Sequence, residues 1–214
     1  MPGVTKPIRL RVPALAGVLL AASLSAAHAH PHVWVTTRAE FVFAPDGRVT
    51  AIRHAWTFDP SYSAFTVQGL GQGIPNAEAL AALARDNVEA LGDSGYFTSL
   101  KVDGRRQDFS GPEAPAMTYA DGQLTLHFTL PLKAPARGAL ALEVYDPTYF
   151  VAFSLAEGDA VAALKGAPSG CKAVAHRPKS APPQTGMSES FFAALTDAAN
   201  YGVQFANRII VSCS

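Results

Sequence analysis

The chain has 214 residues, of which 49% are hydrophobic and 16% are charged, with 17 basic and 17 acidic side chains. This composition excludes an intrinsically disordered chain, and the length suffices for one domain with a substantial hydrophobic core. No basic block occurs beyond the first residues, so neither nucleic acid nor an anionic membrane surface is expected as a partner.

The first 29 residues have the pattern of a secretory signal peptide. The segment 6–11 contains the basic residues Lys6, Arg9 and Arg11, and residues 14–25 form an apolar stretch. Ala27-His28-Ala29 fits the small-x-small rule for cleavage. We therefore expect a signal peptide over residues 1–29, cleavage after Ala29, and a single periplasmic domain over residues 30–214. An uncleaved N-terminal anchor is the alternative, although the apolar run is short for a membrane span.

Alternation of apolar and polar residues predicts a β-hairpin directly after the leader. Residues 32–43 alternate, Pro45-Asp46-Gly47-Arg48 has turn chemistry, and residues 49–58 return. In the second strand His54 shares a face with Trp56 and Phe58, and that face is predicted to be buried. The next segment, Asp59-Pro60-Ser61-Tyr62, is expected to end the hairpin as a turn.

Later segments predict further strands and two helices. Apolar residues at helical spacing predict a solid helix over about residues 76–91, with Asn76 as its cap, and a short helix over about 188–199. Residues 131–138 are expected to form a loop. With seven or eight strands in all, the expected fold is mainly β with helical additions (α+β), built as an antiparallel sheet or sandwich.

The chain has two cysteines, Cys171 and Cys213. In an exported protein such a pair predicts one disulfide, which would stabilise the fold by about 3–4 kcal/mol in the chain-entropy model. A thiol catalyst or a metal-binding pair is the less favoured alternative, because neither residue lies in a short cysteine motif.

The strongest candidates for chemistry are His30 and His32. After cleavage behind Ala29, the amine and imidazole of His30 could chelate one Zn, Ni, Co or Cu ion, and His32 could add a further nitrogen. Pro31 lacks an amide N–H, so a planar site built from successive deprotonated amides is disfavoured. The alternative is a pair of terminal histidines with no ligand role.

Four further residues are secondary candidates for the same ion: His54, Asp59, His127 and Asp146. Each also has a simpler interpretation. His54 would be a hydrogen-bonded core histidine, and His127 would be an ordinary residue on the polar face of its strand. Asp59 and Asp146 lie in two similar segments, Phe58-Asp59-Pro60-Ser61-Tyr62 and Tyr145-Asp146-Pro147-Thr148-Tyr149, in which Asp before Pro typically opens a turn.

Enzyme signatures are missing from the sequence. It contains no Gly-x-Ser-x-Gly elbow, phosphate-binding loop, dinucleotide fingerprint or His-Glu-x-x-His helix. Catalysis is therefore the less favoured class of function.

Several runs together resemble a bacterial exported family known only as domain of unknown function number one thousand and seven. These runs are His-Pro-His-Val-Trp-Val at 30–35, Trp-Thr-Phe-Asp-Pro at 56–60, Leu-His-Phe-Thr-Leu-Pro-Leu at 126–132, Val-Tyr-Asp-Pro-Thr-Tyr-Phe at 144–150, Gly-Ala-Pro-Ser-Gly-Cys at 166–171 and Phe-Ala-Asn-Arg-Ile at 205–209. The resemblance implies the periplasmic component of an uncharacterised ABC-type transport system, often encoded beside nickel/cobalt-type transporters.

One departure from the family matters for its cofactors. Many relatives resemble EF-hand proteins in an Asp-rich loop ahead of the helix, whereas here residues 69–74 read Gly-Leu-Gly-Gln-Gly-Ile. Because Ca²⁺ requires several oxygen ligands, no calcium is expected at this loop.

The leading hypothesis is a periplasmic accessory or binding protein for transition-metal transport, with an inner-membrane metal transporter or permease as its partner. Two other classes stay open. A copper-dependent oxidative enzyme built on an N-terminal histidine chelate would turn over in the presence of a reductant. A metal-free module that docks onto a membrane permease through aromatic strand edges would bind no stoichiometric metal.

Overall fold

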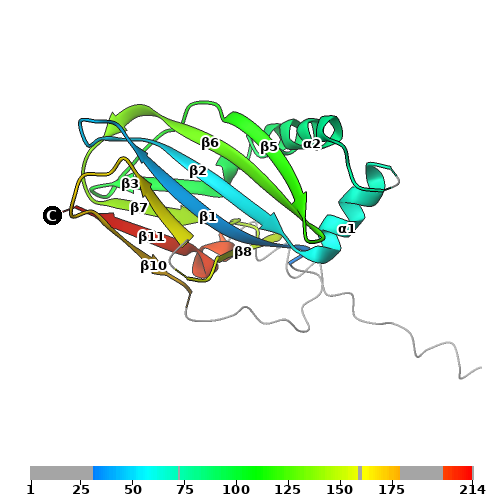
Figure 1. The fold of residues 1–214 in the computed structure, drawn as a ribbon. Helices are drawn as coiled ribbons and strands as arrows, with labels where there is room; N and C mark the ends of the chain where they lie inside the picture. Colours follow the sequence, from blue (N-terminus) through cyan, green and yellow to red (C-terminus); the bar gives the residue numbers. More distant parts are fainter. Residues whose placement is uncertain (1–30, 72, 159–160, 179–199, 214) are drawn as a thin grey trace, which may run out of the picture.

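The computed structural model describes residues 31–71, 73–158, 161–178 and 200–213. Two β-sheets lie one behind the other, and two α-helices lie at one end of them (Figure 1). The predicted class, mainly β with helical additions, is therefore confirmed. The helix expected over about 188–199 and the signal peptide expected over 1–29 both lie outside the described residues.

The larger sheet has six strands and is centred on β1 (Val33–Phe43). Its path runs β5-β6-β2-β1-β8, and β9 pairs with β1 beyond the end of β8. The other strands of this sheet are β2 (Val49–Phe58), β5 (Glu113–Ala120), β6 (Gln123–Ala136), β8 (Val151–Leu155) and β9 (Ala162–Lys165).

This sheet is mixed, because the expected antiparallel pairing is found in three of its five strand pairs and the other two are parallel. β2, β5 and β6 pair in antiparallel fashion, but β8 and β9 both run parallel to β1. The reason lies in the chain path, because β8 follows β7, a strand of the other sheet. The chain thus reaches β1 by crossing between sheets, which allows a parallel pairing that a tight hairpin cannot form.

The smaller sheet has five strands in the order β10-β11-β7-β3-β4, and all its pairs are antiparallel. Eleven strands are thus found in the described part of the chain, more than the seven or eight expected. The strands of this sheet are β3 (Thr98–Val102), β4 (Arg105–Arg106), β7 (Leu140–Val144), β10 (Lys172–His176) and β11 (Asn207–Ser212).

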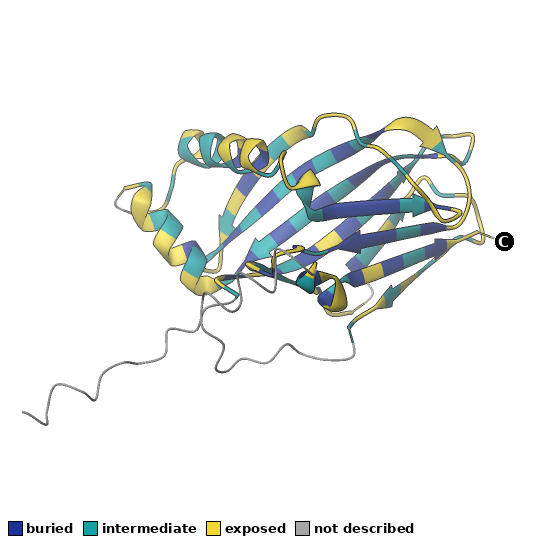
Figure 2. Ribbon diagram, turned by 180° about the vertical axis from the view of Figure 1, so that it is seen from behind, coloured by how far each residue is buried: buried dark blue, intermediate teal, exposed yellow. Residues whose placement is uncertain are grey.

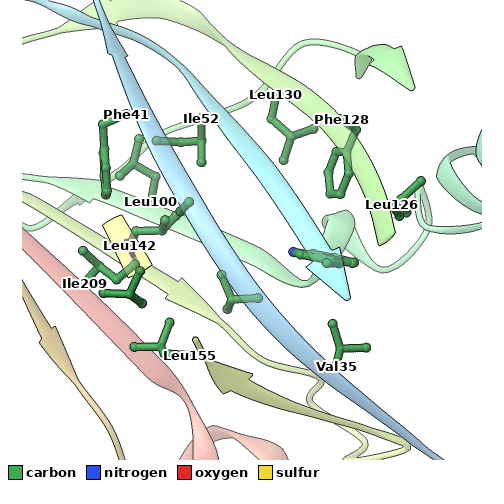
Figure 3. Packing of buried hydrophobic residues seen from close by; sticks show 14 of the residues in the cluster. Val35, Phe41, Ile52, Leu100, Leu126, Phe128, Leu130, Leu142, Leu155 and Ile209 are labelled. Carbon is green, nitrogen blue, oxygen red and sulfur yellow. The ribbon is translucent and has the colours of Figure 1, made fainter. Parts of the chain in front are cut away.

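The hydrophobic core fills the space between the sheets. Along β1 and β2 buried residues alternate with more exposed ones, as the sequence pattern predicts (Figure 2). Phe41 and Ile52 of the larger sheet and Leu100, Leu142 and Ile209 of the smaller one belong to one buried cluster (Figure 3). Their burial is the main stabilising contribution to the fold.

The predicted solid helix is α2 (Ala77–Ala90), and Asn76 caps it by accepting the Ala79 N–H at 2.8 Å. Ala84 and Val88 are buried where the helix packs on β5 and β6. This prediction is confirmed because a strong apolar stripe and a cap residue agree.

A second helix, α1 (Pro60–Gly69), occupies the place where only a turn was expected. Its apolar residues do not gather on one face, and Ser63 is its only buried residue, so periodicity gives no signal. The start signal was present, since Asp59 is the N-cap and Pro60 takes the first helical position. None of the described helices is long and apolar enough to cross a membrane.

The expected loop at residues 131–138 is also mostly wrong, because β6 continues to Ala136. The register between β2 and β6 shifts in this extension: Ala51 pairs with Pro131 and Val49 pairs with Ala136, so the extra residues lie in β6. Two short 3₁₀ turns, Gly95–Phe97 and Tyr201–Phe205, complete the described elements.

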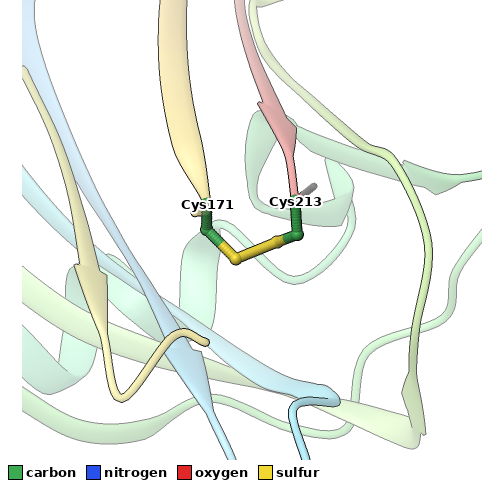
Figure 4. The surroundings of a disulfide bond; sticks show 2 residues. All are labelled: Cys171 and Cys213. Atoms are coloured by element: carbon green, nitrogen blue, oxygen red, sulfur yellow. A yellow bond between two sulfur atoms is a disulfide. The ribbon is translucent and has the colours of Figure 1, made fainter. Parts of the chain in front are cut away.

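The predicted disulfide between Cys171 and Cys213 is formed (Figure 4). It joins the start of β10 to the end of β11, closing a sequence separation of 42 residues. β10 and β11 are also paired with each other, and Lys172 lies opposite Ser212. The disulfide joins the residues directly beyond this last pair.

Candidate functional site

Three of the six predicted ligand residues, His32, Asp59 and Asp146, lie around the start of β1. His32 immediately precedes the strand and is exposed. Its backbone N–H donates to the Phe150 carbonyl at 2.9 Å, and its ring lies 4.7 Å from the Phe150 ring between centroids. His32 is therefore held at the surface by a fixed backbone contact. His30 lies outside the described residues.

Asp59 lies beside this strand start, on the side of β2. Its Oδ1 accepts the Tyr62 N–H at 3.0 Å and thereby caps α1, while its Oδ2 accepts the Trp34 N–H at 3.1 Å. The Asp59 N–H also donates to the Trp34 carbonyl at 2.9 Å. The carboxylate thus joins the first turn of the helix to the first residues of β1.

Asp146 lies on the other side of the strand start, next to β8, and is only 3% exposed. Its Oδ1 accepts both the N–H and the hydroxyl of Thr148 at 2.8 Å, and its Oδ2 accepts the Val151 N–H at 2.9 Å. Asp146 therefore stabilises a turn, as its simpler interpretation predicts, whereas Asp59 caps a helix instead of opening a turn. Metal binding by either carboxylate would compete with these hydrogen bonds.

His54 lies in the core between the two sheets and is 2% exposed. It stacks on Phe128 and meets the edge of Trp56, and its Nε2 lies 3.3 Å from the Thr98 hydroxyl. Because that hydroxyl donates to the Tyr96 carbonyl at 2.7 Å, it accepts from the His54 Nε2–H. Burial lowers the pKa of His54 to about 3, so the ring is neutral at pH 7.

His127 lies on the opposite face of the same sheet. It pairs in register with Ala55, whereas His54 pairs with Phe128, so the two histidines point to different sides. His127 Nε2 is 3.3 Å from the Thr118 hydroxyl, and partial burial lowers the pKa of its imidazole. His54 and His127 are therefore separated by the sheet, and neither joins the start of β1.

A shallow hollow of about 320 Å³ beside His127 was not foreseen from the sequence. Arg38, Glu40 and Arg53 line it, and Arg53 donates to Glu40 at 3.1 Å. The alternation of residues along β1 and β2 predicts that this face of the sheet is polar. It does not predict the hollow, which arises where small alanine side chains lie on neighbouring strands.

The five predicted ligands that lie among the described residues thus fall into three separate places. His32, Asp59 and Asp146 surround the start of β1, His54 lies in the core, and His127 lies on the outer face of the sheet. Within the described residues there is no group of three or more His, Cys, Asp or Glu side chains that could hold a metal ion.

Comparisons with known proteins give a family but no activity. A family model described as "Protein of unknown function (DUF1007)" matches residues 15–213. An uncharacterized protein of Haemophilus influenzae is 25% identical over 199 residues, which cover 86% of this chain and 91% of that protein. No solved structure matches the chain.

Proposed function

The chain belongs to the DUF1007 family, and we propose that it is a periplasmic accessory or binding protein for transition-metal transport that holds one ion through His30 and His32. The observation that carries the proposal is the placement of a His-Pro-His segment directly before β1, with the His32 ring exposed and its backbone fixed to Phe150 at 2.9 Å.

The ligand chemistry follows from the mature terminus. With cleavage after Ala29, His30 offers an amine and an imidazole that form one chelate ring around Zn, Ni, Co or Cu. Pro31 removes the amide that a planar peptide site would need, so the next available nitrogen is the imidazole of His32. Two imidazoles and one amine leave coordination positions open, as a carrier that passes its ion to a transporter requires.

The other four candidates are left out of the proposed ligand set. Asp59 and Asp146 already accept two and three hydrogen bonds from the chain, and opening these caps would destabilise the start of β1. His54 is buried in the core, and His127 lies on the outer face of the sheet, away from the start of β1.

Export is part of the same proposal. The leader pattern of residues 1–29 supports it, and so does the disulfide between Cys171 and Cys213, because such bonds persist in oxidising compartments. The resemblance of the chain to periplasmic components of transport systems points in the same direction, and an inner-membrane metal transporter or permease is the proposed partner.

The test begins with expression from the natural leader, purification of the exported form and sequencing of its N-terminus. Calorimetric titration with Zn, Ni, Co and Cu should show one site in a protein that begins at His30. Replacing His30 and His32 with alanine should abolish that site, whereas His176→Ala, at an exposed histidine on β10, should leave the affinity unchanged. A double variant that keeps full affinity would contradict the proposal.

A metal-free docking module is the second candidate, and the exposed aromatic residues at the same end favour it. Trp34 of β1 is 49% exposed, and Phe150, which directly precedes the neighbouring strand β8, is 46% exposed. Exposed aromatic side chains are enriched at protein interfaces. If no ion binds at stoichiometric amounts but Trp34→Ala abolishes association with a membrane permease, this candidate replaces the first.

A further inference from the structure

An apolar pocket of about 180 Å³, here named the Trp56 pocket, lies at the end of the sandwich beside the start of β1. Val35 and Trp56 of the larger sheet form one wall, Leu91 at the end of α2 forms another, and Phe153 of β8 closes a third side. Phe150 also lines it and is 46% exposed, so the pocket reaches the surface beside that ring.

The pocket exists because the two sheets have unequal lengths at this end. The smaller sheet begins at Thr98, whose hydroxyl meets His54, whereas β2 continues past His54 through Trp56 to Phe58. Residues of α1 and α2 cover this end of β2: Tyr62 stacks on Phe58 with ring centroids 4.8 Å apart. The remaining space is the pocket.

Its lining selects for uncharged ligands. None of the side chains that line it is Asp, Glu, Lys, Arg or His, and the amide nitrogen of Asn87 is already donated to the Leu83 carbonyl at 2.8 Å. A charged group placed there would lose its hydration and meet no opposite charge, with only the neutral side chains of Tyr62 and Asn87 as polar neighbours, which is unfavourable. For comparison, a cavity of about 150 Å³ lined by apolar side chains accepts benzene.

Trp56, which lines the pocket, has a polar group that is unpartnered within the described part of the chain. The residue is 2% exposed, and its indole Nε1–H finds no acceptor among the described residues. A buried donor without a partner is uncommon and costs free energy. In Trp56 this unsatisfied polar group belongs to a residue that lines the pocket.

The backbone around the pocket adds a third observation. Phe97 lines it with a φ of 46°, and Tyr149, which precedes the lining residue Phe150, has a φ of 57°. Left-handed backbone in bulky residues is costly, and it persists mainly where the surrounding structure uses the resulting side-chain position. Of the two, Phe97 lines the pocket itself, whereas Tyr149 packs on Phe205 beside it.

We propose that the Trp56 pocket binds a small, neutral ligand whose size is that of a single aromatic ring. The binding site is distinct from the proposed metal ligands, His30 and His32, and does not require that the protein bind metal. Its specificity comes from volume and from the absence of charge, and its aromatic walls favour a ring over a flexible chain of equal size.

Trp56 itself can report binding, because the chain has only two tryptophans. In a Trp34→Phe variant, Trp56 is the sole tryptophan, and its emission is followed during titration with toluene, benzyl alcohol, benzoate and benzylamine. We expect saturable changes with toluene and benzyl alcohol at about 1 mM or below. Benzoate and benzylamine, which have similar size but carry a charge, should bind at least tenfold more weakly.

Two variants that fill the pocket from different elements complete the test, so that failure of one to fold leaves the other. Leu91→Phe adds volume from α2, and Val151→Phe adds volume from β8. Either one should weaken binding of toluene at least tenfold. Val174→Phe is the matched control, because this valine is 52% exposed on β10 in the other sheet.

Three outcomes would overturn the proposal. The first is the absence of a saturable change with either neutral probe. The second is equal affinity for the charged and neutral probes, which would indicate non-specific association. The third is unchanged affinity in a folded variant with a filled pocket. Because no metal is present in the titration, the result is independent of the metal-binding experiment.

Discussion

Lowering the pH from 7 to 5 should destabilise the protein through His54. Burial lowers the pKa of this histidine from 6.5 to about 3 in the folded protein. In the unfolded chain the ring takes up a proton near its ordinary pKa, so the unfolded state binds more protons at every pH between these two values. The contribution of neutral His54 to stability is therefore complete above pH 6.5 and is lost as the pH falls towards 3.

The magnitude at pH 5 depends mainly on the unfolded state. At 1.5 units below the ordinary pKa, and at about 1.4 kcal/mol per unit, the loss is about 2 kcal/mol. The result holds for any folded pKa well below 5. Charged partners do not explain the shift, because the recorded neighbours of the ring are Trp56, Phe128 and the Thr98 hydroxyl.

Urea denaturation at pH 7 and pH 5 measures this loss. His54→Gln will lower the stability at both pH values. The quantity to compare is therefore the difference in unfolding free energy between pH 7 and pH 5, in which this common loss cancels. The difference should shrink by about 2 kcal/mol in His54→Gln relative to the parent protein. His176→Gln, at an exposed histidine, should behave as the parent does. Equal pH dependence in the parent and in His54→Gln would refute the argument.

Two further predictions concern stability. Replacing Cys171 and Cys213 with serine should lower the unfolding free energy by about 3–4 kcal/mol, as measured by urea denaturation against the same protein with the bond intact; a loss below 1 kcal/mol would show that the paired strands alone restrict the unfolded chain. Asp146→Ala should cost about 2–4 kcal/mol because it removes the acceptor of two partly buried N–H groups, those of Thr148 and Val151, and of the Thr148 hydroxyl. Asp59→Ala should cost about 1–2 kcal/mol as the loss of a helix cap. Thermal and urea unfolding of both variants measures these losses. A larger loss of unfolding free energy in Asp59→Ala than in Asp146→Ala would contradict the expected order.

The elements that could be predicted are those in which one strong local pattern decides. Alternation along β1 and β2 gave their buried faces and placed His54 inside, and the stripe and cap of α2 gave its bounds to within a residue. The helix α1 was missed because its apolar residues follow no period, and its start signal at Asp59 was interpreted as a turn. Asp-Pro serves both purposes, and only the residues that follow distinguish them.

Features that depend on the chain path could not be predicted in the same way. The parallel pairing of β8 and β9 with β1 follows from the crossing between sheets, which leaves no mark in the strands themselves. The Trp56 pocket is lined from β1, β2, both helices and the segment before β8, so no local pattern indicates it. Alternation along the strands predicts that His54 and His127 lie on opposite faces of the sheet. It does not predict that both lie far from His32.

The similarity of the two Asp-Pro segments is explained by the strand that lies between them. Asp59 holds β1 directly, since its Oδ2 accepts the Trp34 N–H. Asp146 holds β8 through the Val151 N–H, and Val151 pairs with Val33 of β1. The first residues of a domain tend to fray unless they are tied down, and here each neighbouring strand is anchored by a carboxylate on its own side. The repeated Asp-Pro segment therefore accounts for the fixed position of His32 at the surface, and a ligand role of either carboxylate is not needed to explain the repeat.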